Sequence, residues 1–126
     1  MTEDGNRRPV HWVGSSRADL KEFPDKVQDH IGFALYQAQI GRKHRDAKPL
    51  TGIGRGVLEV VSRFDSDTYR AVYTVRFPEA IYALHVFQKK SRTGIATPRF
   101  EIDLVKQRLG AAERHYAATY GKGQRR

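Results

Sequence analysis

Three side chains of this 126-residue chain are suited to proton exchange: Glu59, His85 and Lys89. A carboxylate, an imidazole and an amine are groups that serve as general bases and acids in proteins. Arginines suited to binding and polarising phosphate occur in the same part of the chain, namely Arg55, Arg63, Arg70 and Arg92. Metal-free RNA cleavage needs such a set, because the attacking 2′-hydroxyl requires a base, the leaving oxygen an acid and the phosphate nearby cations.

Most of these residues fall on three predicted strands that form an antiparallel meander. The β-branched and aromatic patterns predict strands over residues 57–64, 69–77 and 80–87. The first two are joined by a four-residue turn, Asp65–Thr68, and the last two by Pro78-Glu79. The segment Tyr69–Arg92 is therefore a hairpin that ends in a cationic cluster.

The turns predict the register of the meander, and the register decides which side chains share a face. The predicted pairs are Phe77–Ala80, Val72–His85 and Arg70–Phe87 in one hairpin, and Phe64–Tyr69, Arg63–Arg70 and Glu59–Thr74 in the other.

Alternation along the strands then produces two different faces. One is apolar and suited to cover by helices: Leu58, Val60, Phe64, Tyr69, Ala71, Tyr73, Val75, Tyr82, Leu84 and Val86. The other is cationic and aromatic: Glu59, Val61, Arg63, Arg70, Val72, Thr74, Arg76, His85, Phe87 and Lys89. The second face suits single-stranded RNA, because cations bind phosphates and a phenylalanine ring stacks on a base. A shift of one residue would exchange the faces.

The rest of the chain supplies helices. After a short strand over residues 10–13, Ser15 or Ser16 begins a helix to about Phe23, and a second helix runs over residues 24–40. The second helix has an apolar stripe of Val27, Ile31, Ala34, Leu35 and Ala38; Phe33 lies off it and is assigned to a widened core rather than to a partner. Thr97 is predicted to cap a last helix that begins at Pro98.

The predicted architecture is α+β, with element order β-α-α-β-β-β-α and all helices packed on one face of a small antiparallel sheet. A single domain is expected over residues 10–120, between a flexible tail at 1–9 and a basic tail at 121–126. The segment 49–56 has GxGxG spacing but no strand–loop–helix context, so it is predicted to be a flexible loop that carries Arg55.

Composition favours an anionic partner. The 23 Lys and Arg residues outnumber 14 Asp and Glu residues and leave a net charge of +9, which favours nucleic acid or a large ribonucleoprotein. No cysteine is present, which excludes disulfides and thiolate metal sites. Without an apolar spanning run or a secretory signal, a cytoplasmic location is expected. The five histidines show no metal-ligand spacing, so neither a metal nor another cofactor is expected.

Each candidate also has a structural alternative. His85 is compatible with a packed or surface histidine, and Glu59 with a simple ion pair to a neighbouring arginine. Lys89 and Lys90 are compatible with a solvated sheet edge that discourages pairing between sheets.

The segment 56–109 resembles the phage-derived, HigB-like branch of the RelE/ParE-type toxins of bacterial toxin–antitoxin systems. The resemblance rests on Val57-Leu58-Glu59, Tyr69-Arg70-Ala71-Val72-Tyr73, Leu84-His85-Val86-Phe87-Gln88-Lys89-Lys90-Ser91, and Thr97-Pro98 before a helix with Glu101, Ile102 and Arg108. The F-x-K-K-[ST] ending followed by T-P is its most specific part.

This resemblance implies a toxin that cuts mRNA on the translating ribosome, without metal or cofactor, and a cognate antitoxin with an XRE-type helix-turn-helix domain. By position, Arg70, Phe87, Lys89 and Lys90 would lie at or near the RNA. The chain departs from the Glu-x-Arg pattern of the family in having Val61, and Arg63 would point to the same face.

Two other functions fit the same residues. One is a non-enzymatic inhibitor of a protein target such as DNA gyrase, as in ParE-type relatives. The other is a catalytically weakened module that binds RNA without cutting it, which the valine at position 61 favours.

Overall fold

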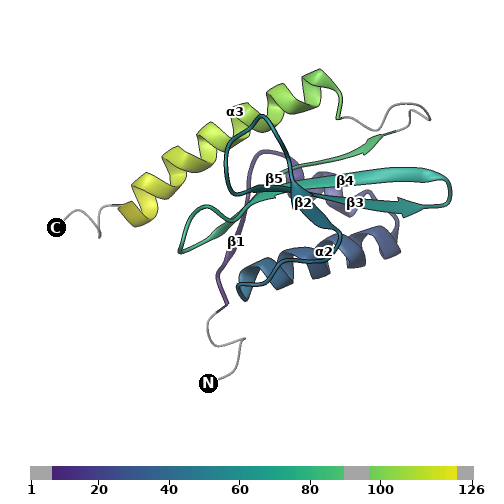
Figure 1. The fold of residues 1–126 in the computed structure, drawn as a ribbon, viewed down its shortest axis with the longest axis horizontal. Coiled ribbons are helices and arrows are strands. Elements are labelled where there is room, and N and C mark those ends of the chain that lie inside the picture. Colours follow the sequence, from purple (N-terminus) through teal and green to yellow (C-terminus); the bar gives the residue numbers. More distant parts are fainter. Residues whose placement is uncertain (1–6, 90–96, 122–126) are drawn as a thin grey trace.

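Five strands form one sheet, in the order β1-β5-β4-β3-β2. The fold is seen in a computed structural model that describes residues 7–89 and 97–121 (Figure 1). Its elements are β1 (Val10–Trp12), α1 (Ser16–Lys21), α2 (Asp25–Gln39), β2 (Ala47–Pro49), β3 (Val57–Phe64), β4 (Asp67–Thr74), β5 (Ile81–Lys89), α3 (Arg99–Tyr116) and the π-helical turn η2 (Ala117–Gly121). The antiparallel meander β3-β4-β5 and the α+β class are confirmed.

Helices cover both faces of the sheet. The predicted stripe of α2 is buried along its whole length and packs on a first core with sheet residues such as Val60 and Tyr73. On α3, Val105, Leu109 and Ala112 are buried in a second core. Figure 1 shows α2 and α3 on opposite sides of the sheet. The prediction that all helices pack on one face was therefore wrong for α3.

A β-bulge explains why the second face is apolar enough to receive α3. Arg70 pairs with Phe87 and Val72 with His85, as predicted, but Tyr73 pairs with Ala83 because the register shifts at this point. Leu84 is the extra residue, and an extra residue reverses the alternation for the remainder of a strand. Tyr82 and Leu84, assigned by sequence to the face with α2, consequently lie in the core beneath α3.

The β3-β4 turn is shorter than predicted. Phe64 pairs with Asp67, so the loop is Asp65-Ser66 rather than Asp65–Thr68. Both loop residues have positive φ, 53° and 73°, as a two-residue type I′ hairpin turn requires. The predicted pairing of Phe64 with Tyr69 was thus wrong by two residues. A shift of two preserves the alternation, so each side chain of β3 and β4 keeps its predicted face.

The sheet edges come from two short strands. β1 pairs parallel to β5, and β2, which the sequence placed in a loop, pairs antiparallel to β3. Arg8, within the expected tail 1–9, is anchored by its guanidinium to the carbonyls of Phe77 (3.1 Å) and Ala38 (2.7 Å). Of the helices in the described part of the chain, none is long and apolar enough to cross a membrane.

The tight turn gives a test of the register. Replacing Ser66 by Gly should raise the free energy of unfolding by roughly 1 kcal/mol, because glycine removes the steric cost of left-handed backbone. Replacing it by Val should lower that free energy by roughly 1–2 kcal/mol, because a β-branched residue is strained there. Urea unfolding measures both. Equal stabilities of the Gly and Val variants would contradict the two-residue turn.

Candidate functional site

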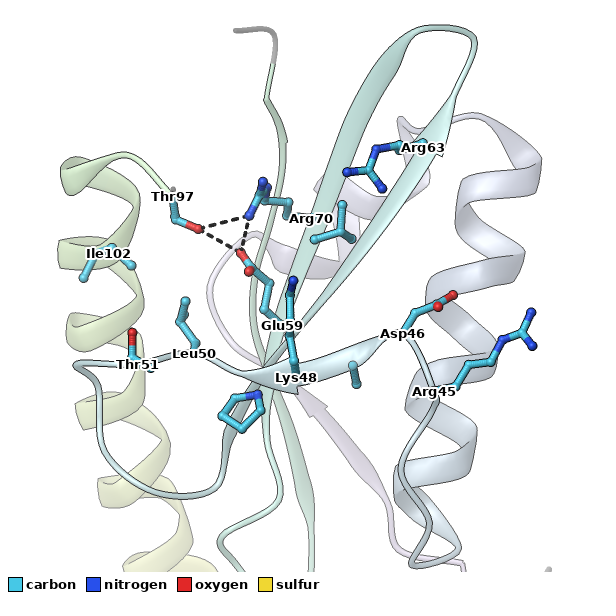
Figure 2. A pocket seen from close by; sticks show the side chains of 13 residues that line it. Arg45, Asp46, Lys48, Leu50, Thr51, Glu59, Arg63, Arg70, Thr97 and Ile102 are labelled. Carbon is cyan, nitrogen blue, oxygen red and sulfur yellow. Dashed lines mark hydrogen bonds and ion pairs between the residues drawn. The ribbon is translucent and has the colours of Figure 1, made fainter. Parts of the chain in front are cut away.

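A buried carboxylate, held by an arginine and a threonine, lies at the centre of the site. Glu59 is 5% exposed, and its Oε2 accepts hydrogen bonds from Arg70 Nη1 (3.1 Å) and Thr97 Oγ1 (2.8 Å). Arg70 Nη1 and Thr97 Oγ1 are 3.5 Å apart and close the triangle drawn in Figure 2. This Glu59–Arg70–Thr97 clamp joins β3, β4 and the residue two positions before α3.

The short turn creates the clamp. With Phe64 paired to Asp67, Arg70 lies opposite Val61 and not opposite Arg63 as predicted. Glu59 and Arg70 then become diagonal neighbours on one face, within reach of each other's long side chains. The register therefore replaces a predicted arginine–arginine contact with an ion pair, which is the structural alternative the sequence left open for Glu59.

Around the clamp is a pocket of about 700 Å³. Its walls come from β2, β3, β4, the residue Thr97 and the first turn of α3, where Ile102 contributes. Lys48 lies directly opposite Glu59 on β2 and is exposed. Four cations, Arg45, Lys48, Arg63 and Arg70, line the pocket against the carboxylates Asp46 and Glu59 (Figure 2). The pocket is therefore cationic around one buried carboxylate.

Val61 and Arg63 both line the pocket, which agrees with the prediction that they lie on the same face of the sheet. Arg63 is exposed near the β3-β4 turn, so its guanidinium is available to a ligand. It can supply the positive charge that the family pattern has two residues earlier.

His85 is built into the support of the site. It is 5% exposed, and its Nε2 lies 2.5 Å from Glu101 Oε1 while Arg108 Nη1 lies 3.3 Å from its Nδ1. A guanidinium can only donate hydrogen bonds, so His85 Nδ1 accepts one from Arg108. His85 Nε2 is therefore protonated and donates a hydrogen bond to Glu101. Both ring nitrogens of His85 are occupied within the fold, and the residue is not among those lining the pocket.

Arg108 is itself fixed from several sides. It donates to the carbonyl of the bulge residue Leu84 (3.1 Å) and to Ser15 Oγ (3.2 Å). Gly14, with a φ of +58°, permits this approach, because a Cβ there would meet Arg108 Nε at 2.9 Å. Arg108 thereby ties α3 to β5 and to the loop before α1.

Phe87, Lys89 and Arg55, also predicted as site residues, are not among the residues that line the pocket. Phe87 is 8% exposed, with its ring stacked on His85 at 5.0 Å, and Lys89 is 9% exposed. Arg55 is exposed in the glycine-rich loop, which Arg76 holds by donating to the Arg55 carbonyl (3.0 and 3.1 Å). Lys90 and Arg92 fall outside the described residues. The roles predicted for all of them stay predictions.

The pocket residues that sequence reasoning did not identify as site residues include Arg45, Lys48 and Thr97. The first two belong to a charged segment whose three-residue strand, Ala47–Pro49, is too short to show alternation and contains a proline. Thr97 was assigned as a helix cap. The cap is Pro98, with no side-chain hydrogen bond, and Thr97 turns to Glu59 instead. The Thr97-Pro98 pair therefore correctly located the start of α3, but the predicted capping role of Thr97 was wrong.

A second cluster, which no spacing predicted, offers metal-ligand atoms. His30, His44 and Asp46 bring together one such atom each, all within 4.8 Å of one another. The hydrogen bond from His30 lowers the pKa of Asp46, and burial lowers the pKa of His44.

Residues 18–110 match the protein family described as "Phage derived protein Gp49-like (DUF891)". The structure is similar to that of a mutant of the E. coli toxin RelE in the free state. That likeness covers 64% of this chain and 81% of the other, at 15% sequence identity and a TM-score of 0.50. The toxin–antitoxin complex RelBE2 from Mycobacterium tuberculosis is similar over 68% of this chain and 94% of the other, at 21% identity and a TM-score of 0.45. No curated protein matches. The likeness to RelE shows the fold, and the family match agrees with the phage-derived resemblance predicted from sequence.

The clamp predicts an ordered set of stability losses. Glu59→Gln should lower the free energy of unfolding by roughly 3 kcal/mol, because the buried Arg70 guanidinium then loses the charge of the Glu59 carboxylate. Thr97→Val should lower it by about 1 kcal/mol, the usual net value of one hydrogen bond. The exposed neighbour Lys48→Gln is the control and should change it by less than about 0.5 kcal/mol.

Urea unfolding of the purified variants, compared at equal m-values, measures these losses. A Glu59→Gln variant as stable as the Lys48→Gln control would contradict the clamp.

Proposed function

The chain belongs to the family of phage-derived Gp49-like proteins, and from that premise we propose that it is the toxin of a toxin–antitoxin system. Its activity is metal-independent cleavage of mRNA. The observation that carries this proposal is the cationic pocket, in which exposed Lys48 and Arg63 surround the buried Glu59 carboxylate. Such a pocket combines a proton acceptor with phosphate-binding cations at one place on the sheet.

The proposed reaction uses the 2′-hydroxyl of the RNA as nucleophile. Glu59 takes the proton of that hydroxyl, and the 2′-oxygen forms a bond to the adjacent phosphorus. The bond from phosphorus to the 5′-oxygen breaks, and Lys48 gives that oxygen a proton. The products are a 2′,3′-cyclic phosphate and a 5′-hydroxyl. Arg63 and Arg70 stabilise the charge that accumulates on the phosphate oxygens in the transition state.

Residues outside the pocket are assigned supporting roles. His85 lies between Glu101 and Arg108 and is a positioning residue that connects β5 to α3. Phe87 covers the His85 ring, and Lys89 occupies the same face of β5 toward its end. Under this assignment the proton that the sequence attributed to His85 or Lys89 comes from Lys48.

The wider partners follow from charge and family. The net charge of +9 favours association with RNA and with the ribosome, whose surface is rich in phosphate. We place the reaction on ribosome-bound mRNA in the cytoplasm. A cognate antitoxin with an XRE-type helix-turn-helix domain would neutralise the toxin, as the family resemblance implies.

Induced expression in bacteria tests the proposed activity. Wild type should arrest growth and fragment mRNA. Lys48→Ala should cut roughly 10²-fold more slowly, the usual contribution of a proton donor. Arg63→Ala should also lose about 10²-fold, as when one transition-state donor is removed. Arg17→Ala is the matched control: an exposed arginine on α1 that is neither a pocket-lining residue nor a predicted site residue, expected to cut like wild type.

Other outcomes would identify the alternatives. A wild type that neither arrests growth nor cuts mRNA contradicts the proposal. Growth arrest with a DNA-damage response and intact mRNA would indicate an inhibitor of a protein such as gyrase. RNA binding that weakens steeply with salt, without cleavage, would indicate a weakened RNA-binding module.

A further inference from the structure

Two histidines and an aspartate come together next to β2, and the aspartate, Asp46, also lines the cationic pocket. His30 is on α2, and His44 and Asp46 are in the segment between α2 and β2. Asp46 Oδ2 lies 2.9 Å from His30 Nε2 and 3.8 Å from His44 Nδ1. The cationic pocket and this cluster share Arg45 and Asp46 as lining residues.

The two separations from Asp46 suit one metal ion, and the ligand atoms of His30 and His44 lie within 4.8 Å of each other. Bonds of about 2.0–2.1 Å at a tetrahedral angle place neighbouring ligand atoms roughly 3.3 Å apart. The two separations from Asp46 Oδ2 fall on either side of that value. Imidazole nitrogens with a carboxylate oxygen are a ligand set that Zn²⁺ and similar divalent transition metals accept.

The surroundings supply the outer hydrogen bond that metal-binding histidines use. His30 Nδ1 lies 2.7 Å from Ser62 Oγ, and Ser62 is 3% exposed on β3. When a metal replaces the hydrogen bond between His30 Nε2 and Asp46, Nε2 presents its lone pair to the ion, and Nδ1 carries the proton and donates a hydrogen bond to Ser62. His44 Nδ1 already acts as an acceptor, from the Asp46 backbone N–H at 2.9 Å. A metal at this nitrogen would replace that N–H as its partner.

The position leaves room for a further ligand. A second pocket, of about 550 Å³, opens beside the cluster and is lined also by Phe33, Gln37 and Lys43. Phe33, which sequence reasoning assigned to the core, is 53% exposed and meets the His44 ring edge-on at 5.6 Å. Lys43 donates to the Ala47 carbonyl at 2.7 Å, so its ammonium is directed to the backbone. Water or a small anion fits the fourth position.

We propose that His30, His44 and Asp46 form a binding site for one divalent transition-metal ion such as Zn²⁺. The ion joins α2 to the segment that leads into β2, and so holds the wall that carries Lys48 in the cationic pocket. Its role is to stabilise that wall, and the proposed RNA chemistry does not require it. The site stands on its own geometry and is independent of the proposed function.

Zn²⁺ titration of tag-free, chelator-treated protein tests the site, by calorimetry and by the midpoint of thermal unfolding. Wild type should bind one ion per chain, and its midpoint should rise with the Zn²⁺ concentration. Asp46→Asn and His44→Gln should each weaken binding at least tenfold, and Ser62→Ala roughly tenfold, as outer-sphere losses do. His44 is buried, so His44→Gln could prevent folding. Asp46 is exposed, so Asp46→Asn is expected to fold and tests the site in either case.

The double variant His11→Gln/His115→Gln is the matched control. These two rings are also close together, at 4.8 Å between centroids, but lie near β1 and the end of α3. Zn²⁺ binding should be unchanged in this variant. The proposal is overturned if wild type binds no Zn²⁺, if Asp46→Asn binds as tightly as wild type, or if the control variant loses binding.

Discussion

The arrangement of the site depends on one buried ion pair. Glu59 and Arg70 are 5% and 7% exposed, and a charge so deep in a protein is stable only with a partner and hydrogen bonds. Thr97 supplies a further hydrogen bond from outside the sheet. The clamp thus fixes three chain segments at once and determines where α3 can begin. The clamp also holds the Glu59 carboxylate within a pocket that four cationic side chains line.

Both sheet faces are covered, and this leaves little of the sheet open to a ligand. The bulge at Leu84 turns Tyr82 and Leu84 toward α3, and Arg108 fastens that helix through the Leu84 carbonyl. The open part of the face with α3 is the pocket around the clamp, whose lining includes residues of β2, β3 and β4 together with Thr97 and Ile102. Packing, not only charge, therefore decides where a phosphate can approach.

The sequence allowed the main elements and the placement of most side chains to be predicted, because alternation and helical spacing are strong signals. The α2 stripe and the pairing of Arg70 with Phe87 are examples. Register at the β3-β4 turn was not predictable in the same way, since Asp65-Ser66 lacks the usual glycine of a type I′ turn. A single-residue bulge leaves no mark in the hydrophobic pattern, so the face of Tyr82 was misassigned.

Only the site residues on long strands were predicted from the sequence, because only long strands show clear alternation. Glu59, Arg63 and Arg70 are on long strands and were identified from alternation. Lys48 and Thr97 come from a three-residue strand and a loop end, and only tertiary contacts bring them to the pocket. The same holds for His30, His44 and Asp46, whose spacing matches no familiar metal motif but whose atoms meet in space.

We propose that RNA in the pocket is cut by attack of the RNA's own 2′-hydroxyl, and the ends left at the cut distinguish this reaction from others. Purified protein would be added to ribosomes carrying a defined mRNA, and the new ends mapped. We expect a 2′,3′-cyclic phosphate and a 5′-hydroxyl at the cut, and no cut when the nucleotide on its 5′ side carries 2′-deoxyribose. Cleavage that persists at the 2′-deoxy position, or ends bearing a 5′-phosphate, would contradict it.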